Sequence, residues 1–213
     1  YLPEALVNYL GRMGWSMPDE SEKFTLSQML EHFDIQRVSL GGPIFDVAKL
    51  SWLNGLWIRE DLSQAQLAER LHDWAFNKDY LMQILPHAQK RMDILSDFAP
   101  LAAFFASGQL TITEADFAEC QLQADELAQA LQFTLWSLES LRHWQRDDLF
   151  AAMKSLADAS DIKLKDFLAP LFIAITGTAT SVSVIEAMTI LGPDMSRARV
   201  RHALNAIGAG ELG

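Results

Sequence analysis

The chain has 213 residues, half of them hydrophobic, and a formal net charge of −11. This composition excludes a disordered chain and is sufficient for one large domain or two small ones with a real core. The acidic balance argues against nucleic acid as a partner, although local basic patches on an acidic protein remain compatible with RNA binding.

No apolar run approaches the roughly 18 residues of a membrane span, and no signal peptide opens the chain, so no membrane contact is expected. The single cysteine, Cys120, forms no internal disulfide and suggests a reducing compartment. It has no evident histidine partner, so a structural role is favoured over a nucleophilic one. The start at Tyr1-Leu2-Pro3, without an initiator methionine, indicates a fragment or the second half of a longer protein.

Helical spacing of apolar residues dominates and strand signals are weak, which predicts an all-α fold. The first helix begins at Pro3. Thr25 with Gln28, and Ser63 with Gln66, form capping boxes that begin two further helices.

Residues 38–60 combine a loop broken by Gly41-Gly42-Pro43 with a helix from Asp46 to about Arg59. Gly55 lies inside this helix at a cost of about 1 kcal/mol against alanine, which suggests a packing or contact reason. Apolar stripes predict a core position for four tryptophans and leave Trp15 and Trp144 at helix ends. The four are Trp52, Trp57, Trp74 and Trp136.

The second half of the chain continues the helical pattern. Pro86 should bend or break a helix that begins near Asp79 and ends near Lys90. Ser183 with Glu186 forms a third capping box, and Gly192-Pro193 ends that helix. The other predicted helices are short ones within 98–112, a long one from about Ala118 to Trp144, then Asp147–Ala159, Leu164–Ile175 and Ser196–Ile207. In the last helix Arg197, Arg199 and Arg201 lie mostly off the apolar side.

The motifs of common catalytic sites are missing: the chain has no phosphate-binding P-loop, no H-E-x-x-H and no C-x-x-C. A G-x-G-x-x-G match at Gly208 follows a helix rather than a strand and is interpreted as false. Asp147 and Asp148 lie at the start of a predicted helix, where the helix dipole favours negative charge. The histidines are scattered and are read as surface or satisfied residues: His32, His72, His87, His143 and His202. No catalytic, cofactor-binding or metal-binding residue is assigned.

Two places resemble a binding site. Lys90 and Arg91 form a basic cluster at a helix end, where compensation of the helix dipole is the alternative reading. The Thr176–Ser183 loop offers hydroxyls and backbone donors before a helix N-terminus, a geometry that suits RNA, or it is an ordinary helix connection.

Several motifs together resemble bacterial glutamyl-tRNA synthetase over nearly the whole chain, most strongly at both ends. They are Leu2-Pro3-Glu4-Ala5-Leu6, Gly14-Trp15-Ser16, Val38-Ser39-Leu40-Gly41-Gly42-Pro43, Trp52-Leu53-Asn54-Gly55, Pro170-Leu171 and Thr176-Gly177. The family's H-I-G-H-like and K-M-S-K-S-like ATP signatures are not among them.

The resemblance implies that this chain is the part of the enzyme that follows those signatures. That part consists of a stem-contact fold and then an all-helical anticodon-binding cage. We divide it as a stem-contact region (1–61), a first anticodon-binding subdomain (62–103) and a second one (104–213). The parent would join glutamate to tRNA(Glu) with ATP and magnesium, as a cytoplasmic monomer. This chain would contain no cofactor site and would be inactive alone.

The resemblance also implies RNA-binding residues. Arg91 matches an R-x-D-x-L segment whose arginine, in some members, reads the third anticodon base and separates glutamate from glutamine tRNAs. Ser181 and Val184 align with positions that contact the other bases, and Lys90 neighbours Arg91. Phe172 departs from the family, since many members have arginine after Pro-Leu, so it is either core or a stacking residue.

Two alternatives stay open from the sequence. One is a related chain that no longer charges tRNA and serves as a binding or regulatory module. The other is a helical protein-interaction domain, which the acidic charge would suit.

Overall fold

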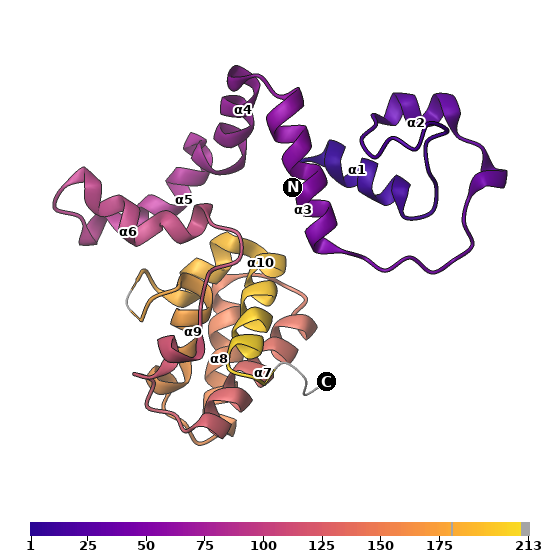
Figure 1. Ribbon diagram of the computed structural model, residues 1–213. Coiled ribbons are helices and arrows are strands. Elements are labelled where there is room, and N and C mark those ends of the chain that lie inside the picture. Colours follow the sequence, from indigo (N-terminus) through magenta and orange to yellow (C-terminus); the bar gives the residue numbers. More distant parts are fainter. Residues whose placement is uncertain (180, 210–213) are drawn as a thin grey trace. The chain divides into compact units, whose positions relative to one another are not determined.

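A computed structural model describes residues 1–179 and 181–209. Within these ranges the chain contains helices and turns and no strand, so the all-α prediction is confirmed (Figure 1). The chain divides into two compact units, Tyr1–Trp74 (unit 1) and Ala75–Gly213 (unit 2). The finer division of the second part into two subdomains stays a prediction.

Unit 1 is built from short helices whose starts follow local signals. The capping boxes at Thr25 and Ser63 are confirmed, because Thr25 Oγ1 accepts the Gln28 N–H at 3.1 Å and Ser63 Oγ accepts that of Gln66 at 3.3 Å. The helices are α1 (Pro3–Arg12), α2 (Leu26–His32), α3 (Val47–Leu56) and α4 (Gln64–Leu71). Tighter or wider turns accompany them: η1 (Ile35–Arg37), η2 (Trp57–Asp61) and η3 (His72–Phe76), the last of which crosses the unit boundary.

The core of unit 1 is small and contains one buried polar side chain, Asn8, at its centre. Asn8 Oδ1 accepts the Trp57 indole N–H at 3.2 Å and the Phe24 N–H at 3.3 Å. Its amide nitrogen donates to the Glu22 carbonyl at 3.2 Å. The side chain therefore joins α1, the 22–24 segment and the end of α3 without leaving its own oxygen or nitrogen unbonded.

Asp46 caps α3 as expected, accepting the Ala48 N–H at 2.8 Å. The helix continues past Leu56 as the wider turn η2. A Cβ on Gly55 would meet only the flexible end of Arg59, with Nη1 at 2.6 Å, so no rigid neighbour requires this glycine. Asn54 has a clearer role, because its Oδ1 accepts the Leu2 N–H at 2.8 Å.

The tryptophan prediction was right for one of the four residues, Trp57, which is buried. Trp15, which the sequence placed at a helix end, is buried as well. The prediction was wrong for the other members of the apolar stripes, because short helices in a small unit, or at the rim of a larger one, carry more apolar surface than their cores can cover. These are Trp52, Trp74 and Trp136, each about half exposed.

Unit 2 contains the longer helices and the main core. They are α5 (Lys78–Ala88), α6 (Phe98–Ala102), α7 (Ala124–Ser140), α8 (Arg146–Ala159), α9 (Leu164–Thr176) and α10 (Val184–Ala206). The intervening turns are η4 (Gln89–Arg91), η5 (Leu95–Asp97), η6 (Ala103–Ala106) and η7 (Glu114–Phe117). α5 passes through Pro86, ends at Ala88 and continues as the tighter turn η4. α7 is shorter at both ends than predicted.

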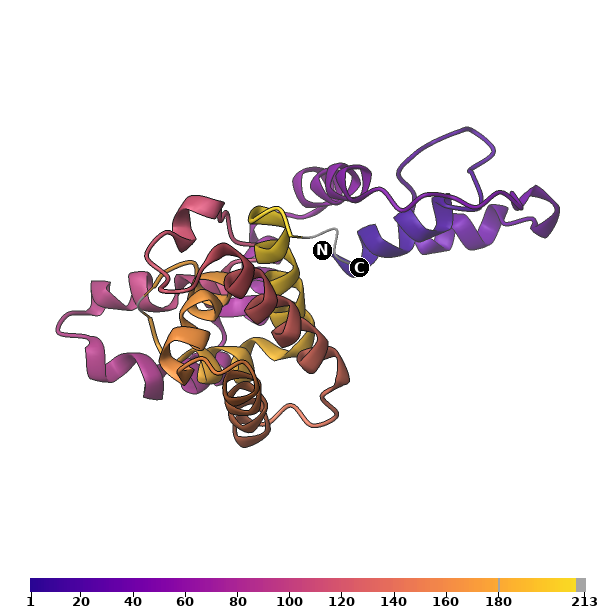
Figure 2. The ribbon, with the colours of Figure 1, turned by 90° about the horizontal axis from the view of Figure 1, so that it is seen from below.

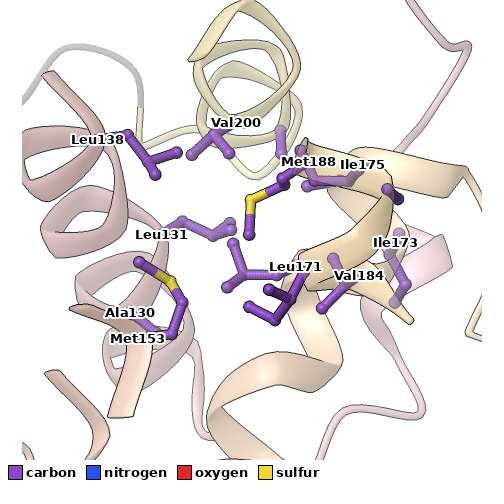
Figure 3. Close-up of a cluster of buried hydrophobic side chains, with 14 of the residues drawn as sticks. Ala130, Leu131, Leu138, Met153, Leu171, Ile173, Ile175, Val184, Met188 and Val200 are labelled. Carbon is purple, nitrogen blue, oxygen red and sulfur yellow. The ribbon is translucent and has the colours of Figure 1, made fainter. Parts of the chain in front are cut away.

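α10 packs against α9 and α7, and the three lie side by side in both ribbon views of unit 2 (Figures 1 and 2). Side chains from these helices and α8 interlock in the core shown in Figure 3. Those that the figure labels are Ala130, Leu131, Leu138, Met153, Leu171, Ile173, Ile175, Val184, Met188 and Val200.

The predicted helix break at Gly192-Pro193 appears as a kink inside α10, where Gly192 has φ 79° and ψ 174°. Met188 lies one turn before the kink, and its carbonyl accepts the Trp144 indole N–H at 2.8 Å. This bond ties the first part of α10 to the segment that precedes α8.

Candidate nucleic-acid interface

Arg91 and Ser181 are far apart in the sequence but in direct contact in unit 2. Arg91 ends η4, the turn after α5, and Ser181 lies in the loop between α9 and α10. The Arg91 Nη1 donates a hydrogen bond to the Ser181 carbonyl across a separation of 90 residues. The fold thus brings together two of the residues that the sequence singled out.

The contact leaves binding capacity on both residues. Arg91 is exposed, and its other guanidinium nitrogens have no partner among the described residues. The Ser181 side chain is only 4 % exposed, yet its Oγ also has no partner there. Since an unpaired buried hydroxyl costs about 1–3 kcal/mol, this Oγ is available to bond to water or to a ligand.

The start of α10 differs from the sequence prediction. Ser183 makes no side-chain cap, so the third capping box is wrong. Its partner Glu186 instead accepts the Arg146 Nε–H at 2.7 Å, from a helix 40 residues away. The first N–H groups of α10 therefore lack a capping hydroxyl beside Ser181.

The remaining candidates occupy different environments. Val184 is 1 % exposed and belongs to the core, so only its backbone is placed to contact a ligand. Phe172 is half-buried and packs against the same core from α9. Lys90 is exposed and makes no ion pair within the described residues. No side-chain hydrogen bond or ion pair of the described residues joins Phe172 or Lys90 to the Arg91–Ser181 pair.

An open, mostly apolar groove of about 780 Å³ is lined by Gln89 and Met92, on either side of Arg91 in the sequence, but not by Arg91 itself. Met92 lines it next to Arg91, and Ile94 and Leu95 form an exposed part of its wall, 64 % and 90 % accessible. Apolar walls of this kind suit an unstacked planar ring.

The connection from α9 to this site is held by its own backbone geometry. Gly177 ends α9 in the left-handed conformation, with φ 77°, and its N–H donates to Ile173 O at 2.9 Å. Thr176 Oγ1 donates to the Phe172 carbonyl at 2.8 Å. Thr180 lies outside the described residues.

Sequence reasoning missed Arg199. It was placed mostly off the apolar side of its helix, but it is 1 % exposed and lies against the core. Its guanidinium donates to backbone carbonyls, among them Ile175 at 2.5 Å and Phe104 at 2.7 Å. Burial lowers the pKa of Arg199 to about 10, so it stays charged at neutral pH. Only its position on the α10 face that also carries Val200 and Ala203 hinted at burial.

The other two arginines of this helix follow the prediction more closely. Arg197 donates to the Leu138 carbonyl at 2.7 and 3.0 Å and lies over Trp144. Arg201 pairs with Glu139 on the surface at 2.8 Å.

Cys120 and the groups that were not assigned a catalytic or metal-binding role are also described by the structure. Cys120 is half-buried, and burial raises the pKa of its thiol, which weakens it as a nucleophile. Within residues 1–179 and 181–209 no group of His, Cys, Asp or Glu is arranged to hold a metal ion. No helix of that described part is long and apolar enough to cross a membrane. The end of the Gly208 motif lies outside the described residues.

Comparison with protein families gives two matches. Residues 66–204 match a family described as the anticodon binding domain. Residues 1–52 match the catalytic domain of class I tRNA synthetases (E and Q).

Individual relatives agree with these matches. The glutamate–tRNA ligase of Cellvibrio japonicus is 64 % identical over 208 residues, which cover 98 % of this chain and 41 % of that protein. The same enzyme of Saccharophagus degradans is 60 % identical over the same shares. The chain thus spans about two fifths of the length of these curated relatives.

A solved structure supports the fold. The crystal structure of a glutamate tRNA ligase from Elizabethkingia meningosepticum superposes with a TM-score of 0.55 at 20 % identity, over 97 % of this chain and 42 % of that one. Since the anticodon-binding family covers well over half of the chain and the helical fold agrees, this chain belongs to the anticodon binding domain family of tRNA synthetases.

Proposed function

We propose that this chain is the tRNA-recognition part of a glutamate–tRNA ligase and that it binds the anticodon loop of tRNA(Glu) through Arg91 and the loop around Ser181. The observation that carries the proposal is the hydrogen bond from Arg91 to the Ser181 carbonyl. It holds one edge of the guanidinium and leaves the other edge available.

A guanidinium held in this way suits the recognition of an unpaired base. Its planar fork donates two parallel hydrogen bonds, which select a base edge with two acceptors. The apolar groove lined by Gln89 and Met92 offers walls on which an unstacked ring can lie. Ser181 Oγ and the uncapped N–H groups of α10 add donors for a neighbouring base or phosphate.

The parent would attach glutamate to tRNA(Glu) with ATP and magnesium, as a monomer in the cytoplasm. The match of residues 1–52 to the class I catalytic family supports a catalytic part in the rest of the parent. The described residues of this chain present no metal-binding group, so we assign ATP and magnesium to that other part. In this division the chain positions the tRNA and does not perform the chemical step.

Binding measurements with the 213-residue chain test the proposal. Fluorescence anisotropy at low and moderate salt should show tighter binding to tRNA(Glu) than to an unrelated tRNA, with an affinity that falls as salt rises. Arg91→Gln should reduce the preference for the correct third anticodon base by at least about fivefold, since one good bidentate contact contributes about 1–3 kcal/mol of discrimination.

Arg142→Gln is the matched control, because Arg142 is an exposed arginine of the same unit with no partner in the described part of the chain. It removes the same charge and should change the affinity less than twofold. Equal binding of tRNA(Glu) and the unrelated tRNA by the unmutated chain would overturn the proposal. That outcome would favour a module that binds protein instead.

A further inference from the structure

Arg199 is a charged side chain in a place where an apolar one would ordinarily pack. It is 1 % exposed, beside Val200 and Ala203, which are fully buried. In the described part of the chain its hydrogen-bond partners are all backbone carbonyls, and none is a carboxylate. They are Phe104, Ser107, Gly108 and Ile175.

Burying a cation without an anion is costly, so the carbonyls must replace its water. Ile175 lies in the last turn of α9, where helical carbonyls commonly lack an intrahelical partner, Phe104 lies within η6 and Ser107 directly follows it. The same positions carry the negative end of a helix dipole. Arg199 thus joins two segments about 70 residues apart, a role that a smaller or uncharged side chain cannot fill.

The segment that Arg199 fixes leads into the RNA candidate site. Ile175 comes two residues before Gly177, where the loop turns with φ 77°. The loop carries Ser181, whose carbonyl accepts the bond from Arg91. Its far end is fixed by Val182 and Val184, both 1 % exposed in the core.

We propose that Arg199 is a positioning residue of this site: by fixing the end of α9 it sets the place of the Ser181 carbonyl, and so the orientation of Arg91. The consequence for tRNA reading rests on the proposed function. The mechanical part, coupling between Arg199 and Arg91, does not require RNA.

The coupling is measurable in the chain without tRNA. Hydrogen exchange of the α10 amides reports the unfolding equilibrium of this unit. Arg91→Gln should raise that opening equilibrium about tenfold in the unmutated chain, as expected for the loss of a charge-assisted hydrogen bond. In an Arg199→Lys background, where lysine cannot reach all the carbonyls, the same change should have less than a twofold effect.

Arg197→Lys is the matched control. Arg197 lies on the same helix and also donates twice to a backbone carbonyl, that of Leu138, and its ion pair and ring contact are with Asp194 and Trp144 rather than with the loop. In its background Arg91→Gln should keep its full effect. If Arg199→Lys fails to fold, Gly177→Ala provides a second perturbation, because alanine is strained at φ 77° while its Cβ meets only Leu110 at 3.5 Å.

The RNA measurement then separates the two proposals. Arg199→Lys should lower the preference for the correct third base from at least about fivefold to below twofold, and Arg197→Lys should leave it unchanged. Additive effects of Arg91→Gln and Arg199→Lys on hydrogen exchange would overturn the positioning role, even if the chain prefers tRNA(Glu). Non-additive effects in a chain that shows no tRNA preference would support the positioning role and overturn the proposed function.

Discussion

Replacing Gly192 by alanine tests how the kink in α10 is built. Gly192 has φ 79° and ψ 174°, a conformation that is essentially restricted to glycine, and it precedes Pro193. A Cβ at this position would meet nothing within 4 Å, so the substitution adds no clash. The whole cost is therefore backbone strain.

Such strain costs about 1–3 kcal/mol. An alanine that instead relaxed to negative φ would rotate the second part of α10 and displace buried Ser196 and Arg199, which costs at least as much. For a protein of this size, 1 kcal/mol corresponds to about 2–4 °C in Tm. A loss of about 2 kcal/mol therefore predicts a decrease of about 4–8 °C in the transition of unit 2.

Differential scanning calorimetry measures this decrease, with Gly108→Ala as the control. Gly108 lies in the same unit, also has open space around it, and does not have positive φ. Its substitution should change Tm by no more than about 1–2 °C. An unchanged Tm in Gly192→Ala, or an equal loss in both variants, would refute the assignment of the cost to backbone strain.

Three further predictions concern unit 1 and the lone thiol. Asn8→Ala leaves the Trp57 indole N–H and the Phe24 N–H without their acceptor, so urea unfolding should show a loss of about 2–4 kcal/mol; a loss below about 1 kcal/mol would contradict the network. Hydrogen bonds and charges from Lys49 and Arg12 lower the pKa of the Glu22 carboxyl below 4.5 in the folded chain. As pH falls, Glu22 therefore binds a proton in the unfolded chain before it does so in the folded chain, and the stability that its ion pairs contribute is lost as pH falls through the folded pKa. Lys49→Met should flatten that acid loss in melts between about pH 6 and 3, and an unchanged slope would exclude the pairing. Burial raises the pKa of Cys120, so alkylation at pH 8 should be slower than that of free cysteine, and an equal rate would contradict its inert environment.

Local signals predicted the parts of this fold that depend on neighbours in sequence. The caps at Thr25, Ser63 and Asp46 formed as expected, because each requires only a side chain and the N–H groups two or three residues later. The helical class followed from the spacing of apolar residues in the same way. Ser183 shows the limit of this reasoning, because its expected partner Glu186 bonds to Arg146, which only tertiary packing brings near.

The same distinction between local signals and tertiary packing applies to the candidate site. The sequence drew attention to Arg91 and Ser181 by composition and family resemblance, since a basic cluster and a hydroxyl-rich loop are visible in the letters. It did not place the two in contact, and it put Arg199 mostly off the apolar side of its helix. Those outcomes depend on contacts between residues that are 90 and 95 positions apart in the sequence.

The sequence by itself determined the helices, most of their starts and the family, because each depends on short-range patterns of side chains. Only the tertiary structure decided which polar groups were buried, which tryptophans reached a core and which carbonyls held Arg91 and Arg199. The physical reason is that burial and hydrogen-bond partners are properties of packed surfaces. Two helices with the same periodicity can present a side chain to water or to the core, and the choice is made by the elements that cover them.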